Sequence, residues 1–185
     1  MDSPNKDKTR RNFIKTSTAA AAAASALPRK AKGFQGGSEE IKVGLVGCGG
    51  KGTSDIRQVL GVDDKIKLWA MGDALDRNAQ GRYKALANGG TKEKVDCKDR
   101  VFSGIDAFQK VIDSGVDIVF LVTSPGFRPV HFDYAVEQGK HVFMQKPCSV
   151  DGRGSRMLLE SNKKAKAKGL KVGVGFQRRH DARYK

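Results

Sequence analysis

The chain has few cysteines and few aromatic residues, and each shortage excludes a class of protein. Its three cysteines, Cys48, Cys97 and Cys148, are an odd number and lack the spacing of metal ligands. The sequence therefore indicates neither a disulfide framework nor a metal site. Only 7% of the residues are aromatic, and no apolar run reaches the roughly 20 residues that a membrane-spanning helix needs. The length that remains after an N-terminal signal suits one globular domain.

Acidic residues are also scarce beside basic ones. The chain has 20 Asp and Glu against 35 Lys and Arg, a formal net charge of +15. Much of the surplus lies in residues 151–185, where Arg156, Glu160 and Lys164 stand at i, i+4 spacing. This pattern is typical of a solvated helix face. Because no nucleic-acid motif and no ladder of stacking aromatics accompanies these residues, we expect no nucleic-acid partner.

The most informative motif is a glycine-rich turn after a short apolar run. Residues 41–52 read IKVGLVGCGGKG and contain Gly47-x-Gly49-x-x-Gly52. In such a loop the first glycine permits a tight turn, and the second leaves the backbone open to a pyrophosphate. The third lets the next helix, expected over residues 53–60, pack on the strand and aim its positive end at the phosphates.

An acidic residue follows at the spacing that a dinucleotide site needs. A second apolar run, residues 65–71, ends in Gly72-Asp73, and Asp73 lies 21 residues after Gly52. A carboxylate ~20 residues past the loop accepts hydrogen bonds from the adenosine ribose and repels a 2′-phosphate, which predicts NAD rather than NADP. Arg77 stands close enough to reach that phosphate, which weakens the preference. The alternative is a glycine-rich turn followed by an N-capping aspartate.

The segment before this loop has the features of an export signal. Arg10-Arg11 precede a mild, alanine-rich stretch over residues 16–27 that contains an Ala-Ser-Ala pattern. These features predict a cleavable twin-arginine signal over residues 1–26 and a linker over residues 27–40. We therefore expect export to the periplasm or another extracytoplasmic compartment, with no stable membrane span. The alternative is a basic tail beside an alanine-rich helix.

The rest of the chain alternates between strand and helix patterns. The predicted strands cover residues 41–46, 65–71, 100–102, 117–122, 141–144 and 171–175. The predicted helices cover residues 53–60, 76–87, 106–114, 129–138 and 152–168. This alternation is typical of an α/β fold with a doubly wound parallel (Rossmann) sheet, here expected over residues 41–180. Strand order 3-2-1-4-5-6 would place the nucleotide at the carboxyl ends of strands one and four.

Motifs after the fourth predicted strand resemble a known family. Thr123-Ser124-Pro125 precedes His131, and residues 139–142 (GKHV) precede Gln145-Lys146-Pro147. This succession resembles the Gfo/Idh/MocA oxidoreductases, whose signature here is Thr-x-Pro, a downstream His, Gly-Lys-His-Val and Glu-Lys-Pro. The resemblance covers residues 41–180 and implies NAD, with NADP as the alternative.

The resemblance also implies roles for individual residues. Lys146 would be the catalytic residue, exchanging a proton with the substrate hydroxyl or anchoring it, and the Lys146–Pro147 bond would be cis. The alternative for Lys146 is a surface lysine after an edge strand. His131 is equally compatible with a cofactor contact and with packing at a helix start. Gln145 stands where the family has Glu, which removes a negative charge beside Lys146. The implied cofactor-binding residues are Gly47, Cys48, Gly49, Gly50, Lys51, Gly52, Asp73, Thr123, Ser124, Pro125, His131, Gln145, Lys146 and Pro147.

The family pattern continues into a second, α+β domain that binds substrate and commonly forms the oligomer interface. We expect residues 181–185 to begin the connection to that domain, and we expect the domain itself to be missing here. We thus expect the cofactor-binding half of an NAD(P)-dependent oxidoreductase acting on the hydroxyl of a sugar, sugar derivative or cyclitol. Two alternatives stay open, an NAD-dependent glycosidase of the same family and a catalytically inactive nucleotide-binding fragment. An oligomer is compatible with all three.

Overall fold

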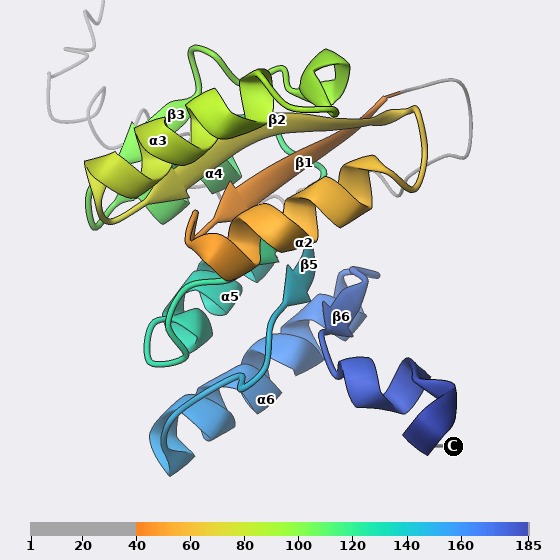
Figure 1. The fold of residues 1–185 in the computed structure, drawn as a ribbon. Helices are drawn as coiled ribbons and strands as arrows, with labels where there is room; N and C mark the ends of the chain where they lie inside the picture. The colour runs from red at the N-terminus through yellow and green to blue at the C-terminus, as the bar shows by residue number, and fades with distance from the viewer. Residues whose placement is uncertain (1–39, 185) are drawn as a thin grey trace, which may run out of the picture. The chain divides into compact units, whose positions relative to one another are not determined.

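Six parallel strands form one sheet in the order β3-β2-β1-β4-β5-β6, as the sequence predicts (Figure 1). The computed structural model describes residues 40–184, so the predicted signal peptide and nearly all of the predicted linker lie outside the described residues. The strands are β1 (Ile41–Val46), β2 (Ile66–Asp73), β3 (Val101–Ser103), β4 (Ile118–Leu121), β5 (His141–Met144) and β6 (Val172–Val174). The helices are α2 (Gly50–Leu60), α3 (Asp76–Ala87), α4 (Ala107–Asp113), α5 (Arg128–Glu137) and α6 (Gly152–Ala167). Short 3-10 turns cover Lys92–Lys94, Gln177–His180 and Ala182–Tyr184.

The start of α2 and the end of β2, both next to the glycine loop, differ from the predicted positions. The helix α2 begins at Gly50, three residues earlier than predicted, because Gly49 is its N-cap and accepts a hydrogen bond from the Thr53 N–H at 3.0 Å. The strand β2 continues to Asp73 because its last residues pair with β3. The glycine loop is therefore partly helical, and Asp73 stands at the very end of its strand.

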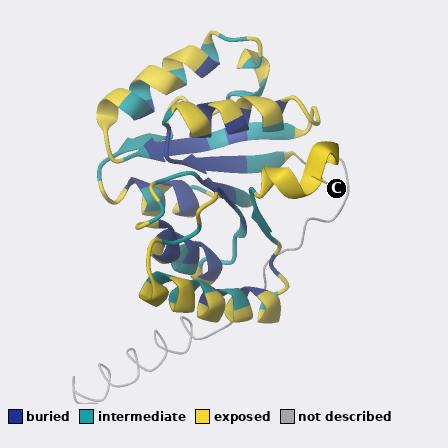
Figure 2. Ribbon diagram, turned by 60° about the horizontal axis from the view of Figure 1, so that its bottom comes forward, coloured by how far each residue is buried: buried dark blue, intermediate teal, exposed yellow. Residues whose placement is uncertain are grey.

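Apolar cores cover both faces of the sheet. On one face α2 and α3 contribute Ile56, Leu60 and Leu86, which pack on β1 and β2. On the other face α4, α5 and α6 cover the sheet with a second set that includes Ile112, Phe132 and Ala165. Figure 2 shows the buried strands between helices whose outer faces are exposed. This burial on both faces is why the strands are nearly continuous apolar runs.

The basic helix α6 is attached to α5 by ion pairs. Lys164 Nζ lies 2.7 Å from a Glu137 carboxylate oxygen and 3.2 Å from one of Asp133, and Lys168 also pairs with Glu137. Glu160 pairs with Lys163 instead of Lys164. Arg156, Glu160 and Lys164 are all exposed, as the predicted solvated face requires, and Lys164 also links two helices. None of the helices within residues 40–184 has the length and apolar character needed to cross a membrane.

The third glycine of the loop generates the first prediction. A Cβ on Gly52 would lie 2.0 Å from the carbonyl oxygen of Gly47, whereas a Cβ on Gly50 would meet nothing within 4 Å. We expect Gly52→Ala to lower the free energy of unfolding by about 3 kcal/mol or more, because the backbone must move to relieve the overlap. Gly50→Ala, the matched control in the same helical turn, should change it by less than about 0.5 kcal/mol. Urea unfolding of the full chain measures both, and equal effects would contradict the packing argument.

Candidate functional site

The glycine loop turns sharply at Gly47 and then leaves open space. Gly47 has φ +97°, and a Cβ there would lie 2.6 Å from the backbone nitrogen of Thr123 at the end of β4. Only glycine fits both the backbone angle and the close approach. A Cβ on Gly49 would meet nothing within 4 Å of its position. The loop is thus tightly packed where it faces the protein and open where a ligand would approach.

Asp73 holds this loop from the neighbouring strand. Its Oδ2 accepts a hydrogen bond from the Cys48 N–H at 2.8 Å, and its Oδ1 accepts from the Leu75 N–H at 2.9 Å and from Asn78 Nδ2 at 3.3 Å. The N-cap of α3 is Leu75, so Asp73 is not the N-capping residue of the alternative interpretation. Backbone N–H groups on both sides, from Cys48 and Leu75, therefore orient the carboxylate. Asp73 thereby connects the end of β2 to the glycine loop.

Cys48 fills the interior of the same turn. Its side chain is fully buried, and its Sγ donates a hydrogen bond to the Gly72 carbonyl at 3.2 Å. Burial raises the pKa of the Cys48 thiol far above its ordinary value, so the group stays protonated. The thiol therefore packs the loop against β2, while only the backbone of Cys48 faces Asp73.

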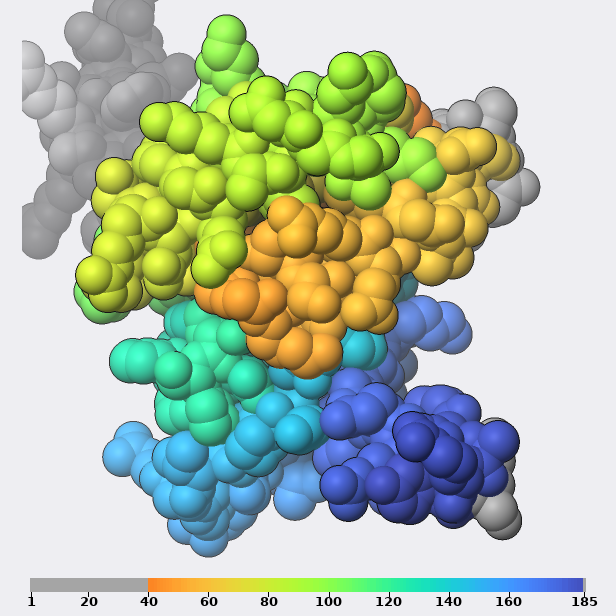
Figure 3. Space-filling view, viewed as in Figure 1, coloured from red at the N-terminus to blue at the C-terminus, as the bar shows by residue number. Residues whose placement is uncertain are grey.

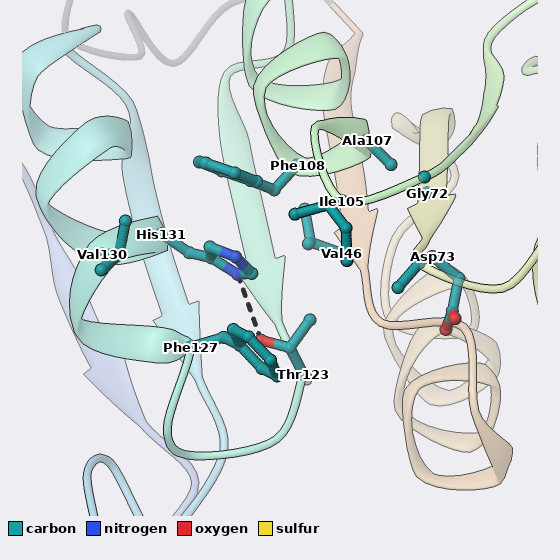
Figure 4. A pocket seen from close by; sticks show the side chains of 12 residues that line it. Val46, Gly72, Asp73, Ile105, Ala107, Phe108, Thr123, Phe127, Val130 and His131 are labelled. Atoms are coloured by element: carbon teal, nitrogen blue, oxygen red, sulfur yellow. Dashed lines mark hydrogen bonds between the residues drawn. The ribbon is translucent and has the colours of Figure 1, made fainter.

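A cavity of about 190 Å³ opens at the carboxyl ends of the strands, between the loops that follow them (Figure 4). Its lining residues are Val46, Gly72, Asp73, Ala74, Gly104, Ile105, Ala107, Phe108, Thr123, Phe127, Val130 and His131. Figure 4 shows the Asp73 carboxylate directed toward the start of α2 and the His131 and Phe108 rings on the opposite wall. The cavity is mostly apolar, with one carboxylate at its edge.

The sequence and the structure select partly different residues here. The structure brings the predicted Asp73, Thr123 and His131 together on the cavity wall, next to the glycine loop. The predicted segment from Gln145 to Pro147 lies outside this wall. Sequence reasoning missed Ile105, Phe127 and Val130, which are apolar yet largely exposed. They follow β3 and β4 in the chain, and this position could have identified them, because parallel sheets bind ligands beyond the carboxyl ends of their strands.

His131 packs at the start of α5 and also lines the cavity. Its ring stacks on Phe108 with centroids 4.1 Å apart, and its Nδ1 lies 3.2 Å from Thr123 Oγ1. It is buried in the first turn of α5 and also lines the cavity. Burial lowers the pKa of His131 to about 4, so the imidazole is neutral near pH 7. The residue therefore supports the packing of α5 while presenting an uncharged ring to the cavity.

The segment around Lys146 is clamped by a buried arginine. Arg128, only 4% exposed, donates from one guanidinium nitrogen to the carbonyl oxygens of Gln145 and Pro147. The Lys146–Pro147 bond between them is cis, as the resemblance implies. Sequence reasoning missed this role of Arg128, because an arginine beside a helix start gives no sign of being buried.

Lys146 itself is exposed, while Gln145 is buried. The Nε2 of Gln145 donates to Asp55 Oδ2 at 2.7 Å, and its Oε1 accepts from the Lys146 N–H at 3.3 Å. The Lys146 ammonium makes no hydrogen bond or ion pair with residues 40–184, so its side chain is available to a ligand. Sequence reasoning also missed Asp55, which lies 90 residues from Gln145.

The fold and the glycine loop agree with a comparison to known families. The profile described as "Oxidoreductase family, NAD-binding Rossmann fold" matches residues 41–176, which is most of the chain and the whole sheet. The chain belongs to the Gfo/Idh/MocA oxidoreductase family. The sheet, its glycine loop and the cavity beside it are accordingly the family's NAD-binding Rossmann domain.

Individual relatives of this Gfo/Idh/MocA chain are dehydrogenases. The chain is 31% identical over 147 residues to an inositol 2-dehydrogenase of Klebsiella pneumoniae, covering 78% of this chain and 39% of the relative. A crystal structure of apo scyllo-inositol dehydrogenase from Lactobacillus casei superposes with a TM-score of 0.58 at 26% identity, covering 77% of this chain and 38% of that one. The same enzyme with bound NAD(H) and scyllo-inositol superposes with a TM-score of 0.62 at 24% identity, covering 78% and 38%, and supports the fold alone. The chain thus spans about two fifths of the length of these relatives.

The buried histidine generates a prediction on pH dependence. The folded-state pKa near 4 lies below the ordinary value of 6.5, so the unfolded chain takes up this proton first as the pH falls. The contribution to stability is therefore complete above pH 6.5 and declines as the pH falls toward 4. We expect the difference in unfolding free energy between the parent and His131→Gln to narrow over this window. Urea unfolding at a series of pH values measures it, and a constant difference would contradict the burial argument.

Proposed function

We propose that this chain binds NAD across the carboxyl ends of β1, β2 and β4, and serves an oxidoreductase that oxidises a hydroxyl of a cyclitol or sugar derivative. The observation that carries the proposal is the joint geometry of the loop and Asp73. The glycine turn is open at Gly49 and leads directly into α2, and a hydrogen bond from the Cys48 N–H joins this turn to the Asp73 carboxylate. The NAD-binding family profile agrees with this geometry.

The glycine loop would hold the pyrophosphate. The first N–H groups of α2 have no partner within the helix, and the helix dipole adds a partial positive charge at this end. The open space beside Gly49 lets phosphate oxygens reach these donors. Lys51 adds less charge than its position implies, because its Nζ pairs with Asp55 at 2.5 Å. We therefore assign phosphate binding mainly to the backbone.

The cavity beside the loop would receive the adenosine end. Asp73 would accept hydrogen bonds from the ribose hydroxyls with the lone pairs that its own contacts leave over. Ile105 and Phe127, both exposed on the cavity rim, offer apolar surface to a flat base. Thr123 and the neutral His131 line the inner wall toward β4. The predicted Ser124 and Pro125 would border the cofactor from the same loop.

Lys146 would serve the reacting hydroxyl. When bound, NAD supplies the acceptor for a hydride from the substrate carbon, and the hydroxyl proton must leave in the same reaction. An exposed lysine on a clamped backbone can take or return that proton, or hold the oxygen electrostatically. The substrate class is proposed from relatives, which are named as inositol dehydrogenases, and from a structure of a Bordetella pertussis dehydrogenase solved with NADH and UDP-GlcNAcA.

Export is a second proposal, which Arg10-Arg11 and the alanine-rich stretch after them support. Residues 1–26 would act as a twin-arginine signal and carry the folded protein out of the cytoplasm. Fractionation of cells that express the parent and an Arg10→Lys/Arg11→Lys variant tests it. Equal export of the two proteins would exclude the twin-arginine route.

The nucleotide site generates a prediction on affinity. Calorimetric titration of the full chain should show that NAD binds at least about tenfold more tightly than NADP, because Asp73 repels a 2′-phosphate. Gly49→Ala should weaken NAD binding by about tenfold or more, since its Cβ would occupy the space for the pyrophosphate. Gly81→Ala, whose Cβ also meets open space but lies on the exposed side of α3, is the matched control and should bind normally. Equal or tighter binding of NADP would overturn the assignment of Asp73.

The same protein tests the reaction. We expect the 185-residue polypeptide to bind NAD without appreciable turnover of inositols or sugars. Holding the substrate carbon against the cofactor is worth about 7–11 kcal/mol, and an exposed lysine by itself does not position a polyol. The absorbance of reduced nicotinamide measures turnover. A robust rate that is lost in Lys146→Met would place substrate binding within this polypeptide.

A further inference from the structure

Asp55 is a buried carboxylate in the helix that follows the glycine loop. It is 7% exposed and lies one turn after Lys51. Its Oδ1 pairs with Lys51 Nζ at 2.5 Å, and its Oδ2 accepts a hydrogen bond from Gln145 Nε2 at 2.7 Å. A carboxylate at this depth persists only where partners replace the lost water. One partner is in its own helix, and the other comes from the end of β5.

The Gln145 carboxamide is held in one orientation. It is 6% exposed, and its two ends face different partners, with Nε2 toward Asp55 and Oε1 toward the N–H of Lys146. A Cβ on Gly175, just past β6, would lie 2.7 Å from Oε1, so the carboxamide is wedged against that backbone. Only a side chain with both a donor and an acceptor satisfies both contacts.

A chain of contacts therefore connects the glycine loop with the Lys146 backbone. It runs from the first turns of α2 through Asp55 and Gln145 to the Lys146 N–H, across the border where α2 meets the residues after β5 (Figure 3). On the other side Arg128 holds the carbonyl groups of Gln145 and Pro147. The Lys146 N–H is thus held by the Gln145 side chain, which Asp55 of α2 holds in turn. The flanking carbonyls are held by Arg128 of α5.

We propose that Asp55 is a positioning residue for Lys146 and acts through Gln145 to couple the nucleotide loop to the backbone that carries the lysine. The function of this coupling rests on the proposed NAD site, but the link itself is present in the nucleotide-free protein. The amide at position 145 is required because Asp55 Oδ2 accepts a hydrogen bond from its Nε2, and a carboxylate there has no donor. A carboxylate at 145 would put two negative charges in contact at a buried site.

Variants that first duplicate the carboxylate at position 145 and then move it there from position 55 provide the test. In the full chain, Gln145→Glu brings the two carboxylates together, and Asp55→Asn/Gln145→Glu restores an amide–carboxylate pair with donor and acceptor exchanged. Gln58→Glu makes the same chemical change on the exposed face of α2, where Gln58 contacts only Ser54 Oγ at 3.5 Å, and is the matched control. The hydrogen-exchange rate of the Lys146 backbone amide measures how firmly this segment is held. The free energy of global unfolding, measured in urea, shows how much of any change in that rate is due to overall stability.

We expect Gln145→Glu to speed exchange of the Lys146 amide by about tenfold or more at pH 7.5, beyond its effect on global unfolding. The double variant should return within about threefold of the parent, and Gln58→Glu should not differ from it. If Gln145→Glu does not fold, recovery of folding and of Lys146 protection in the double variant supports the proposal.

Three results would overturn it: unchanged Lys146 exchange in folded Gln145→Glu, exchange that only follows global unfolding, or no rescue by the double variant. NAD titration of the same proteins separates this proposal from the function. If the parent fails to bind NAD, the proposed function is wrong, and the exchange data still test whether Asp55 positions Lys146 through Gln145. If the parent binds NAD, Gln145→Glu should bind it more weakly and the double variant should recover affinity.

Discussion

The contact between Gly52 and the carbonyl of Gly47 is the constraint on which the site depends. Because no side chain separates them, α2 begins directly at the end of β1 and its first N–H groups stand beside the strand edge. That close start also brings Asp55 down to the level of the β5–α6 connection, where it reaches Gln145. One missing Cβ therefore sets both the open anion-binding end of the helix and its link to Lys146.

Most charged and polar groups around the site are bonded to other groups of the protein. Asp73 binds the loop through Cys48, Arg128 binds the carbonyl groups around Lys146, and Asp55 binds Gln145. His131 is kept neutral by burial and stacked on Phe108. The Lys146 ammonium is the contrasting group, since it is exposed and unpaired among the described residues. The proposed role of Lys146 rests on this contrast between an exposed ammonium and neighbours that are held by other protein groups.

Most of the fold was predictable from local patterns. The helix over residues 76–87 and the strand over residues 141–144 have the predicted bounds, and the strand order is the one expected for a nucleotide-binding sheet of this kind. The start of α2 was missed because its first turn is glycine-rich, which hides a helix from propensity arguments. The link from Lys164 to α5 was not predicted, because i, i+4 spacing describes one helix and says nothing about its neighbour.

The sequence by itself determined the glycine turn, the position of Asp73 and the alternation of strands and helices, because backbone angles, spacing and hydrophobic period are local properties. Only the tertiary structure decided that Arg128 and Asp55 are buried, that His131 is neutral, and that apolar Ile105 and Phe127 border a cavity. Asp55 and Gln145 are 90 residues apart and meet only because α2 and the end of β5 lie at the same edge of one sheet. Burial and pairing of this kind depend on which elements become neighbours, and no local pattern carries that information.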